Sequence, residues 1–559
     1  MKNLISINLV IILFLLLSSC TDDILNQNPK GSVSSEVLDN PAAAEALVIA
    51  SYAGISQVYG RTEGDLNINF LNPASNWILS DVRSDEAYKG GGGTGDLGPV
   101  NSLELGIVSS TDDYNERKWR ALYISISRTN KALAALNSLT EMELPEKFTR
   151  IAEVRVLRGY FYFELKKIWN RFPYIDENDL GSENEVPIEL SSEQLWDLII
   201  ADFQAGVDVL PETQSDVNRV NKYTAHAFLA KTHLFLQNYS DVIDHADEVI
   251  DSGNYRLLDN LQDLYGNPET DNDGENIFAV INSVNDGSFR GSNSYYGDLL
   301  CSPPGPAYGG GDGFRIPTQN MVNTFKVDEN GLPFLETFND SDLAPNDTNT
   351  PVDPRLDHAI GRPGIPWKDY TGEVYGSNWQ RSPQIYGPYA TKKNIINPES
   401  SLRASGGFPW AMGAYNYPLM KYSDVLLWKA EALIESNTNL DEARQLINKI
   451  RQRASDSPVV MRLDGSGPAA NYQIGLYEAD GWTQDVARKA LRMERRLELG
   501  LEGHRFFDLI RWGIVAEVMN EYYETESQKR NYLSGGNFQP GNEYLPLPHN
   551  EVERSGGLY

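Results

Sequence analysis

The sequence predicts a mainly α-helical protein in which paired helices form a repeat scaffold and a loop-rich, aromatic-rich lobe is inserted between them. Three observations support this prediction. Residues 221–255 contain two helix-period runs separated by a short polar turn, and residues 423–453 repeat that plan. Residues 286–417, between these segments, lose helical periodicity and gain prolines, glycines and aromatic residues.

The segment 221–255 is the clearest helical hairpin. Apolar residues recur at helical spacing on both sides of the turn at Gln237-Asn238, at Ala227, Ala230, Leu234, Val242, Ile243, Ala246 and Ile250. The small side chains of Ala227 and Ala230 allow a second helix to approach closely, and Tyr239 can fill the wedge between the helices, as in tetratricopeptide units. One hairpin cannot bury its apolar faces alone, so we expect further tetratricopeptide-like pairs.

Other elements follow from the same patterns. The expected elements are a first helix at Pro41–Val58, a pair formed by Asn115–Leu136 and Glu153–Ile168, a pair formed by Thr483–Leu499 and His504–Met519, and a strand at Glu275–Val284. Gly500 and Gly503 separate the helices of the last pair, since glycine can end a helix. The chain closes with a proline-flanked extended tail, which we expect to dock onto the body.

Length and composition indicate a large soluble globular protein. The chain has 559 residues, of which 41% are hydrophobic and 10% aromatic, with a formal net charge of -30. A surface for nucleic acid needs clustered Lys and Arg to neutralise phosphates, so this charge argues against a nucleic-acid partner and against a simple polyanionic ligand.

The N-terminus predicts export and lipidation. Residues 1–19 contain Lys2, an apolar run and small residues before Cys20, which is the pattern of a secretory signal peptide ending at a lipidated cysteine. The alternative, an uncleaved membrane anchor, is disfavoured because the apolar run is short for a bilayer span. Lipid on Cys20 would leave Cys301 as the sole free thiol and exclude an intrachain disulfide.

The sequence divides into five predicted regions. They are a signal peptide at 1–19, the lipidated Cys20 with a polar tether at 20–40, an N-terminal helical part at 41–285, the loop-rich insertion at 286–417, and a C-terminal helical part with its tail at 418–559.

Two loop regions carry the residues that a sugar-binding site requires. Flat aromatic rings stack on the apolar C–H faces of sugar rings, while Asn, Asp and Arg side chains bind hydroxyl groups. Residues 76–95 have the composition of a mobile loop, and the insertion is unusually rich in aromatics. The candidate ligand-binding residues from these two regions are Trp77, Asp81, Arg83, Asp85, Tyr88, Tyr295, Tyr296 and Tyr308, with Trp367, Trp379 and Trp410 in reserve. For each single ring, burial in the core is the competing interpretation.

No pattern predicts catalysis, a cofactor or a metal. The sequence lacks GxSxG, HExxH and GxxxxGK[ST], and its six histidines do not have metal-ligand spacing. Asp271–Glu275 is similar in composition to a calcium loop, but Val280 stands where the bidentate Glu is required, so we expect a turn. The charged run Glu494, Arg495, Arg496, Glu498, Glu502, Arg505, Asp508 and Arg511 is spaced for ion pairs within and between helices.

Several stretches together resemble the SusD/RagB family of outer-membrane nutrient-binding lipoproteins. They are the lipobox with its acidic continuation, AEVRVLRGYFYFELKKIWNRFPYI (152–175), YNYPLMKYSDVLLWKAEALIES (415–436), ERRLELGLEGHRFFDLIRWG (494–513) and the closing YLPLP. The resemblance covers nearly the whole chain, although residues 552–559 match only loosely.

The resemblance implies a non-catalytic protein, lipid-anchored in the outer membrane, that captures oligosaccharides. It further implies delivery to a SusC-like TonB-dependent transporter and a ligand surface built by the two loop regions named above. Two alternatives stay open. The protein could bind peptides, as RagB-type members do, or it could be a surface glycoside hydrolase, since the 78 acidic residues do not exclude a catalytic pair.

Overall fold

The structure is a computed structural model of the chain. It describes residues 40–56, 71–216, 218–264, 274–287, 293–294, 297–368, 370–404 and 412–559. The predicted signal peptide, the predicted lipidation site Cys20 and residues 21–39 of the predicted tether lie outside these residues, as do Tyr295, Tyr296 and Trp410. Within the described ranges, no helix combines the length and apolar character needed to cross a bilayer.

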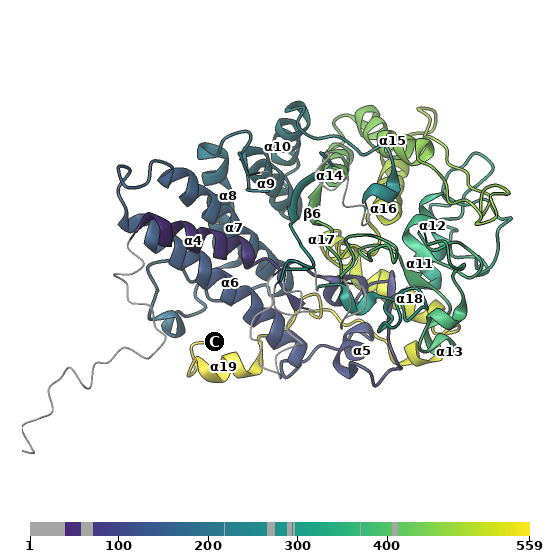
Figure 1. Ribbon diagram of the computed structural model, residues 1–559, viewed down its shortest axis with the longest axis horizontal. Coiled ribbons are helices and arrows are strands. Elements are labelled where there is room, and N and C mark those ends of the chain that lie inside the picture. Colours follow the sequence, from purple (N-terminus) through teal and green to yellow (C-terminus); the bar gives the residue numbers. More distant parts are fainter. Residues whose placement is uncertain are drawn as a thin grey trace, which may run out of the picture.

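Helices make up most of the scaffold (Figure 1). The helices of the first half are α4 (Pro41–Ala53), α5 (Gly98–Glu104), α6 (Asp113–Ser138), α7 (Lys147–Ile168), α8 (Ser192–Val209), α9 (Lys222–Leu236) and α10 (Tyr239–Asp251). The helices of the second half are α11 (Gln319–Asn323), α12 (Arg355–Ala359), α13 (Pro383–Tyr386), α14 (Tyr422–Glu435), α15 (Leu440–Asp456), α16 (Gln484–Leu499), α17 (Arg505–Arg511), α18 (Val515–Glu526) and α19 (His549–Arg554). Neighbours pack in sequence from α6 to α10, and α14 then packs on α9, α10, α15 and α16.

The predicted hairpins are confirmed. Asn221 caps α9 by accepting a hydrogen bond from the backbone of Thr224, and Gln237 adopts the left-handed conformation (φ 60°) that turns the chain into α10. Ala227 and Ala230 are fully buried where the helices meet. The second predicted hairpin forms α14 and α15, and the pair predicted at 115–168 forms α6 and α7.

The last helical pair differs from the prediction in one respect. The break after α16 is confirmed, with Leu501 and Gly503 at positive φ (66° and 83°). The helix predicted at His504–Met519, however, is two helices, α17 and α18. Gly513 at φ 70° separates them, because a left-handed residue cannot continue an α-helix.

Three short antiparallel strand pairs complete the fold. They are β1 (Ala87–Gly90) with β3 (Phe314–Pro317), β2 (Asn276–Val280) with β6 (Tyr417–Lys421), and β4 (Ile360–Gly361) with β5 (Ala390–Thr391). The strand predicted at Glu275–Val284 is therefore confirmed as β2. Since β2 precedes the predicted insertion and β6 ends it, this pair brings the two ends of residues 286–417 together.

Residues 76–95 are not the mobile loop that their composition predicts. They contain a buried π-helical turn at Trp77–Asp81 and strand β1, which registers Tyr88 against Ile316 of β3. The polar residues from Asn76 to Lys89 are buried, and several of them bond to distant parts of the chain, so local hydrophilicity misled the prediction.

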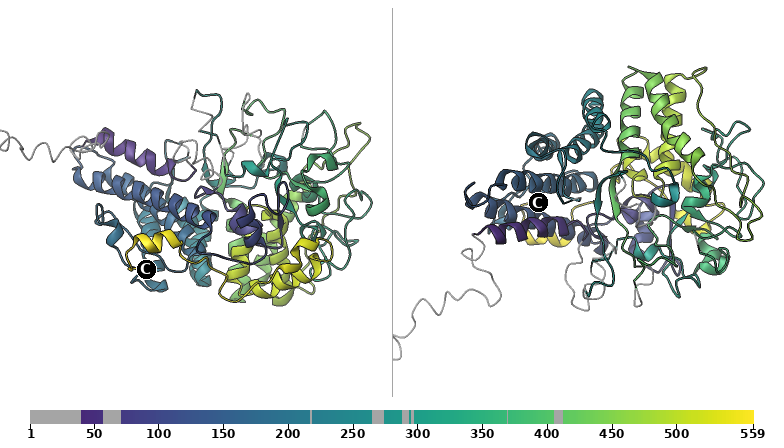
Figure 2. Two further views of the ribbon diagram at one scale, coloured as in Figure 1. Left: turned by 90° about the horizontal axis from the view of Figure 1, so that it is seen from below. Right: turned by 45° about the horizontal axis from the view of Figure 1, so that its top comes forward.

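The insertion folds against the helical scaffold. Its aromatic side chains at Trp367, Tyr375, Trp379, Tyr386 and Tyr389 are buried and belong to the same hydrophobic core as α7 and α9. Figure 2 shows the coil-rich teal-to-green segments gathered on the side away from α4–α8. The region boundaries at 285/286 and 417/418 stay a prediction.

The tail docks onto the body, as expected. The backbone N–H of Leu545 donates to the carbonyl of Ile168 at the end of α7 (2.9 Å), and that of His549 donates to the carbonyl of Ser110 (2.8 Å). These contacts place α19 beside α6, with the C-terminal end next to it (Figure 1).

Candidate functional site

The predicted ligand-binding rings of the early segment lie in the interior. Trp77 is 1% exposed, and its indole N–H donates to the carbonyl of Gly297 (3.1 Å). Tyr88 is fully buried, and its hydroxyl donates to the carboxylate of Glu526 at the end of α18. Neither ring presents a face to solvent on which a sugar could stack.

The polar candidates of the same segment are buried as well. Asp81 accepts a hydrogen bond from the backbone of Gly503 (2.7 Å). Burial raises the pKa of Asp81 well above its ordinary value, against the opposing charge of Arg315. The guanidinium of Arg83 donates to the carbonyl of Asn542 (2.8 Å) and lies 4.1 Å from the centroid of the Phe506 ring.

Asp85 belongs to the same interior junction. Its carboxylate accepts from the Nε and Nη2 of Arg505 (2.9 and 3.1 Å), and Arg496 lies 3.3 Å away. Burial raises the pKa of Asp85, but the charges of Arg496 and Arg505 outweigh burial and hold it at about 2. The carboxylate is therefore ionised and already paired within the protein.

Tyr308 and two of the reserve tryptophans form an aromatic cluster inside the insertion. The hydroxyl of Tyr308 donates to the carbonyl of Ile396 (2.7 Å) and accepts from the indole N–H of Trp367 (3.0 Å). The ring of Trp367 lies 5.3 Å from Trp379 and 5.6 Å from Tyr375, between centroids. Tyr308 is 3% exposed and both tryptophans are fully buried.

These positions correct the sequence-based assignment. Six of the eight candidate residues are structural in the described chain, because their side chains are buried and bonded within the protein: Trp77, Asp81, Arg83, Asp85, Tyr88 and Tyr308. The remaining two, Tyr295 and Tyr296, lie outside the described residues, so their role stays a prediction.

Described residues on either side of Tyr295, Tyr296 and Trp410 form hydrogen bonds with other parts of the protein. The side-chain amide of Asn282 donates to the carbonyl of Tyr415 (2.9 Å). Asn282 follows β2 and Tyr415 precedes β6, so this bond links the residues before 288–296 to the residues after 405–411. Arg403 donates to the carbonyl of Tyr308 (2.9 Å), and its guanidinium lies 5.2 Å from the centroid of that ring. The described residues Asn282 and Arg403, which flank the segments bearing Tyr295, Tyr296 and Trp410, are thus tied to Tyr415 and Tyr308.

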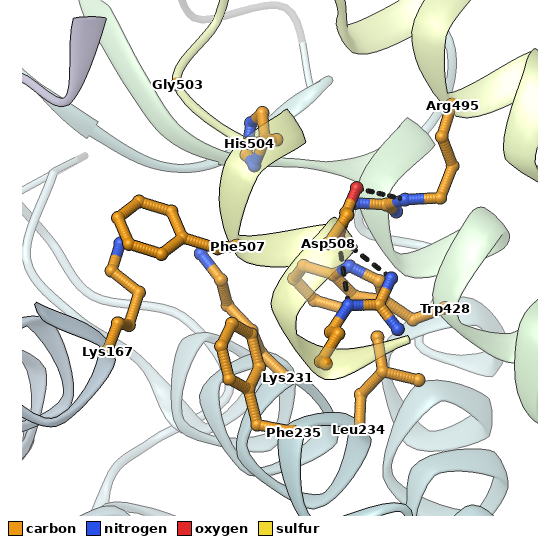
Figure 3. Close-up of a pocket in the computed structure, with 11 residues that line it drawn as sticks. Lys167, Lys231, Leu234, Phe235, Trp428, Arg495, Gly503, His504, Phe507 and Asp508 are labelled. Carbon is orange, nitrogen blue, oxygen red and sulfur yellow. Dashed lines mark hydrogen bonds and ion pairs between the residues drawn. The ribbon is translucent and has the colours of Figure 1, made fainter. Parts of the chain in front are cut away.

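The charged run near the C-terminus is confirmed as structural. Asp508 of α17 lies between Arg495 of α16 (2.8 Å) and Arg511 (2.8 Å), as Figure 3 shows for Asp508 and its partners. The nearby residues Lys167, Lys231, Trp428, Phe507 and others enclose a cavity of only about 20 Å³. Such a space suits a water molecule and excludes a sugar ring.

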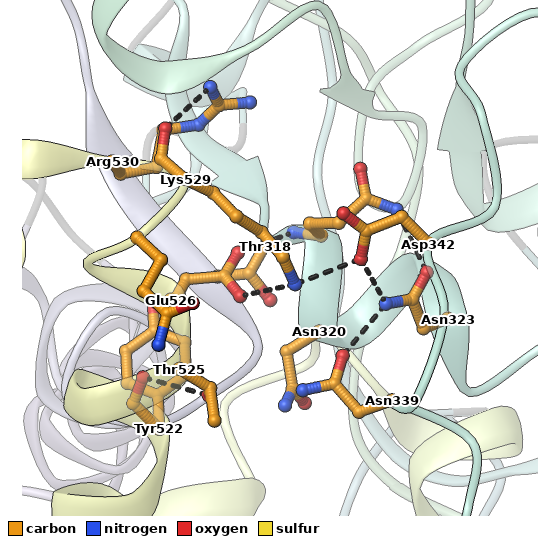
Figure 4. Close-up of polar contacts among 12 residues, drawn as sticks. Thr318, Asn320, Asn323, Asn339, Asp342, Tyr522, Thr525, Glu526, Lys529 and Arg530 are labelled. Atoms are coloured by element: carbon orange, nitrogen blue, oxygen red, sulfur yellow. Dashed lines mark hydrogen bonds and ion pairs between the residues drawn. The ribbon is translucent and has the colours of Figure 1, made fainter.

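A second polar cluster ties the insertion to α18. The ammonium of Lys529 lies 2.9 Å from Asp342 and 3.4 Å from Glu526, and the amide of Asn323 donates to Asp342 (3.0 Å) (Figure 4). Because each of these groups is satisfied by another, the cluster fastens the fold and leaves few groups for a ligand.

A cleft that the sequence analysis missed lies between α6, residues 173–184 and the C-terminal segment. We call it the α6 cleft. It has a volume of about 400 Å³ and is lined by Trp119, Arg120, Tyr123, Ile124, Ile126, Ser127, Asn130, Pro173, Ile175, Leu180, Glu183, Asn184, Glu551, Arg554 and Tyr559. The signal for it was the pair of aromatic residues at helical spacing, Trp119 and Tyr123, within a predicted helix.

Metal binding finds no support in the described chain. No group of three or more His, Cys, Asp or Glu side chains there is arranged to hold a metal ion. Glu275 ends the stretch Asp271–Glu275, whose composition is similar to that of a calcium loop. Its side chain is buried and accepts hydrogen bonds from the backbone of Leu258 (2.6 Å) and from Arg453 (3.2 Å).

Comparison with known families gives two matches. The model of the SusD family matches residues 274–559, and a second model, described as "Starch-binding associating with outer membrane", matches residues 97–234. Among curated proteins, SusD-like protein P2 of Formosa agariphila is 27% identical over 98% of this chain and 97% of its own. A SusD-like protein of Bacteroides ovatus is 22% identical over 92% of this chain and 83% of its own.

Solved structures share the fold along nearly the whole chain. A SusD-like carbohydrate binding protein from Bacteroides fragilis aligns with a TM-score of 0.71 at 22% identity, covering 93% of this chain and 99% of that chain. Surface glycan-binding protein A from Bacteroides thetaiotaomicron, in complex with laminarihexaose, aligns with a TM-score of 0.66 at 19% identity, covering 93% and 99%. At these identities the likeness establishes the fold alone.

Proposed function

Since the chain belongs to the SusD family, we propose that it is a non-catalytic cell-surface lipoprotein that captures oligosaccharides or polysaccharides. The observation that carries the proposal is the family match combined with a fold shared with glycan-binding proteins over more than nine-tenths of the chain.

We infer that the protein is held at the outer membrane by acyl chains on Cys20. The support is the N-terminal sequence, with an apolar run, small residues and then the cysteine. The tether at 20–40 separates the folded body from the membrane. Captured glycan then passes to a SusC-like TonB-dependent transporter, the partner that the family resemblance implies.

Tyr295 and Tyr296 supply ring faces for the glycan in this proposal, and Trp410 supplies a third. The supporting geometry is that described residues flanking these segments are hydrogen-bonded within the protein, Asn282 to Tyr415 and Arg403 to Tyr308. Trp77 has no part in this site, because its ring is buried.

Binding of glycans by the purified mature protein tests the function. A glycan array identifies a ligand, calorimetry measures its affinity, and chromatography of the incubated ligand detects cleavage. We expect retained, unchanged oligosaccharide. Released products would identify a surface glycoside hydrolase, and affinity for peptides without affinity for glycans would identify a RagB-type peptide-binding protein.

Two substitutions test the position of the site. Tyr296→Ala and Trp410→Ala should each weaken glycan binding roughly tenfold, since a stacked ring contributes about 1 kcal/mol beyond its buried area. Phe148→Ala is the control, because Phe148 is an aromatic side chain on α7 that is 53% exposed and far in sequence from both segments. Unchanged affinity in both test variants would reject this placement of the site.

A further inference from the structure

The α6 cleft has the size and the walls of a small-molecule site. Its volume of about 400 Å³ falls within the range of about 300–1,000 Å³ that is usual for ligand pockets. One wall is α6, the second is the turn-rich segment 173–184, and the third comes from α19 and Tyr559. None of the lining residues belongs to the insertion 286–417, so the cleft is separate from the loop segments assigned above.

Aromatic surface is concentrated in the cleft. The rings of Trp119 and Tyr123 lie 4.8 Å apart between centroids, and Trp119 is held edge-on against Trp169 at 5.2 Å. The hydroxyl of Tyr123 donates to the carbonyl of Pro173 (2.6 Å), which fixes the orientation of its half-buried ring. Tyr559, also half-buried, lines the cleft from the C-terminal side. Trp119 is itself buried and supports the ring of Tyr123, whereas Tyr123 and Tyr559 are partly open and can stack on the apolar faces of sugars.

Three polar side chains of the cleft, Asn130, Arg120 and Asn184, have hydrogen-bonding groups that no described residue uses. Asn130 is fully buried, and its Oδ1 accepts no hydrogen bond from any described residue, although its amide donates to the carbonyl of Ile175 (2.9 Å). A buried acceptor without a donor costs free energy, which a hydroxyl group in the cleft would recover. Arg120 and Asn184 are exposed at the rim, and neither side chain forms a hydrogen bond or ion pair with another described residue.

Charge in the cleft is balanced. The guanidinium groups of Arg120 and Arg554 are matched by the carboxylates of Glu183 and Glu551, and Arg554 is itself paired with Glu551 (2.6 Å). A site built for an anionic or cationic ligand would carry an excess of one sign. The combination of rings, planar polar groups and no net charge on the lining side chains fits a neutral sugar.

We propose that the α6 cleft is a second carbohydrate site, which binds a neutral sugar unit of the captured glycan. This inference rests on the proposed glycan-binding function and adds a place on the scaffold where the same glycan is held. The sugar stacks on Tyr123 and Tyr559, and its hydroxyls bond to Arg120, Asn184 and Asn130. A glycan held at two sites dissociates more slowly than one held at a single site.

The two sites can be observed separately by ¹⁹F NMR of the mature protein labelled with 5-fluorotryptophan. Trp119 reports on the α6 cleft and Trp410 on the loop segments. Trp119→Phe and Trp410→Phe, which each remove one resonance, assign these signals. The protein is titrated with laminarihexaose and with neutral hexasaccharides of other linkages. We expect the resonances of Trp119 and Trp410 both to shift and to saturate.

The outcomes distinguish the two proposals. If the resonance of Trp410 saturates while that of Trp119 stays fixed, the second site is rejected and the glycan-binding function stands. If only Trp119 responds, the cleft is confirmed as a carbohydrate site and the loop site is rejected. If neither responds to any sugar, both proposals fail. A shift of Trp119 with a mixture of tryptic peptides and with no sugar rejects carbohydrate as the occupant of the cleft.

Rim substitutions separate direct binding from a remote effect. Arg120→Ala and Asn184→Ala remove exposed groups, so the fold is retained. Each should raise about tenfold the sugar concentration that half-saturates the Trp119 signal, without changing that concentration for Trp410. Arg117→Ala, on the same helix but outside the cleft, is the matched control for Arg120→Ala and should leave both titrations unchanged. Equal effects of test and control variants would contradict the proposal.

Discussion

The carboxylate of Asp85 and the guanidinium of Arg505 form a buried two-point ion pair, with N–O distances of 2.9 and 3.1 Å. The two residues are 420 positions apart in the chain. Asp85 precedes strand β1, and Arg505 opens α17. This pair therefore fastens the segment that was predicted to be a mobile loop to the last helices of the scaffold.

Removing the negative charge of this pair should destabilise the protein severely. Asp85→Asn leaves the buried guanidinium groups of Arg505 and Arg496 without their charge partner, and breaking a buried pair from one side typically costs about 3–5 kcal/mol. The free energy of unfolding from urea titration should fall by that amount.

An exposed ion pair provides the comparison. Asp485 and Lys489 lie 2.7 Å apart on α16 with side chains 67% and 38% exposed. Asp485→Asn should change the free energy of unfolding by less than about 1 kcal/mol, because water screens such pairs. Equal losses in the two variants would show that burial does not set the strength of the Asp85–Arg505 pair.

Mild acid should weaken the fold through His358. Its ring is 7% exposed and lies 3.0 Å from the carbonyl of Pro458, and burial together with the charge of Lys392 lowers its pKa from 6.5 to about 4. Between these pH values the unfolded chain binds a proton that the folded protein does not, so stability falls as pH decreases from about 6.5 to 4.

The size of this effect is on the order of 3 kcal/mol, from about 1.4 kcal/mol for each pH unit. Thermal unfolding of the wild-type protein and of His358→Gln across this pH range measures it. The variant should have a flatter profile than the wild type, while both keep the steeper loss below pH 4 that comes from paired carboxylates such as Asp85. Parallel profiles over the whole range would exclude His358 as the source.

The sequence was sufficient to predict the scaffold because each helical pair carries its own apolar periodicity. Ala227 and Ala230 indicated a close helix contact, and both are fully buried in one. The break between α17 and α18 was missed because a single glycine, Gly513, marks it without a change in periodicity.

The candidate site was predicted less well, for a physical reason. Trp77, Asp85 and Tyr88 stand in a locally polar stretch, which favours an exposed loop. Their partners Gly297, Arg505 and Glu526 are hundreds of positions away, and only the fold reveals that these three side chains are hydrogen-bonded in the interior. Composition thus identified an unusual segment but could not distinguish a ligand surface from a buried junction.

Reaction with a thiol reagent should distinguish Cys301 from Cys20. Cys301 is 1% exposed, and burial raises the pKa of its thiol well above the ordinary value, so it should not react with Ellman's reagent in the folded protein. After unfolding, the lipidated mature protein should titrate one thiol, because the predicted thioether blocks Cys20. Two thiols in unfolded protein isolated from membranes would contradict lipidation of Cys20.

Close packing at Gly206 should make even a methyl group costly. This glycine of α8 faces α7 and α9, and an added Cβ would lie 2.4 Å from Cγ2 of Val156 and 2.8 Å from Cβ of Ala225. Alanine improves helix propensity by about 1 kcal/mol, but overpacking of a dense core costs about 1–3 kcal/mol and both neighbours are buried, so Gly206→Ala should lower the melting temperature. Gly98→Ala is the control, since no atom lies within 4 Å of the corresponding Cβ at the start of α5. A melting temperature for Gly206→Ala at or above that of the wild type would mean that α8 shifts to accept the methyl group, and that the contact between α7, α8 and α9 is looser than the structure indicates.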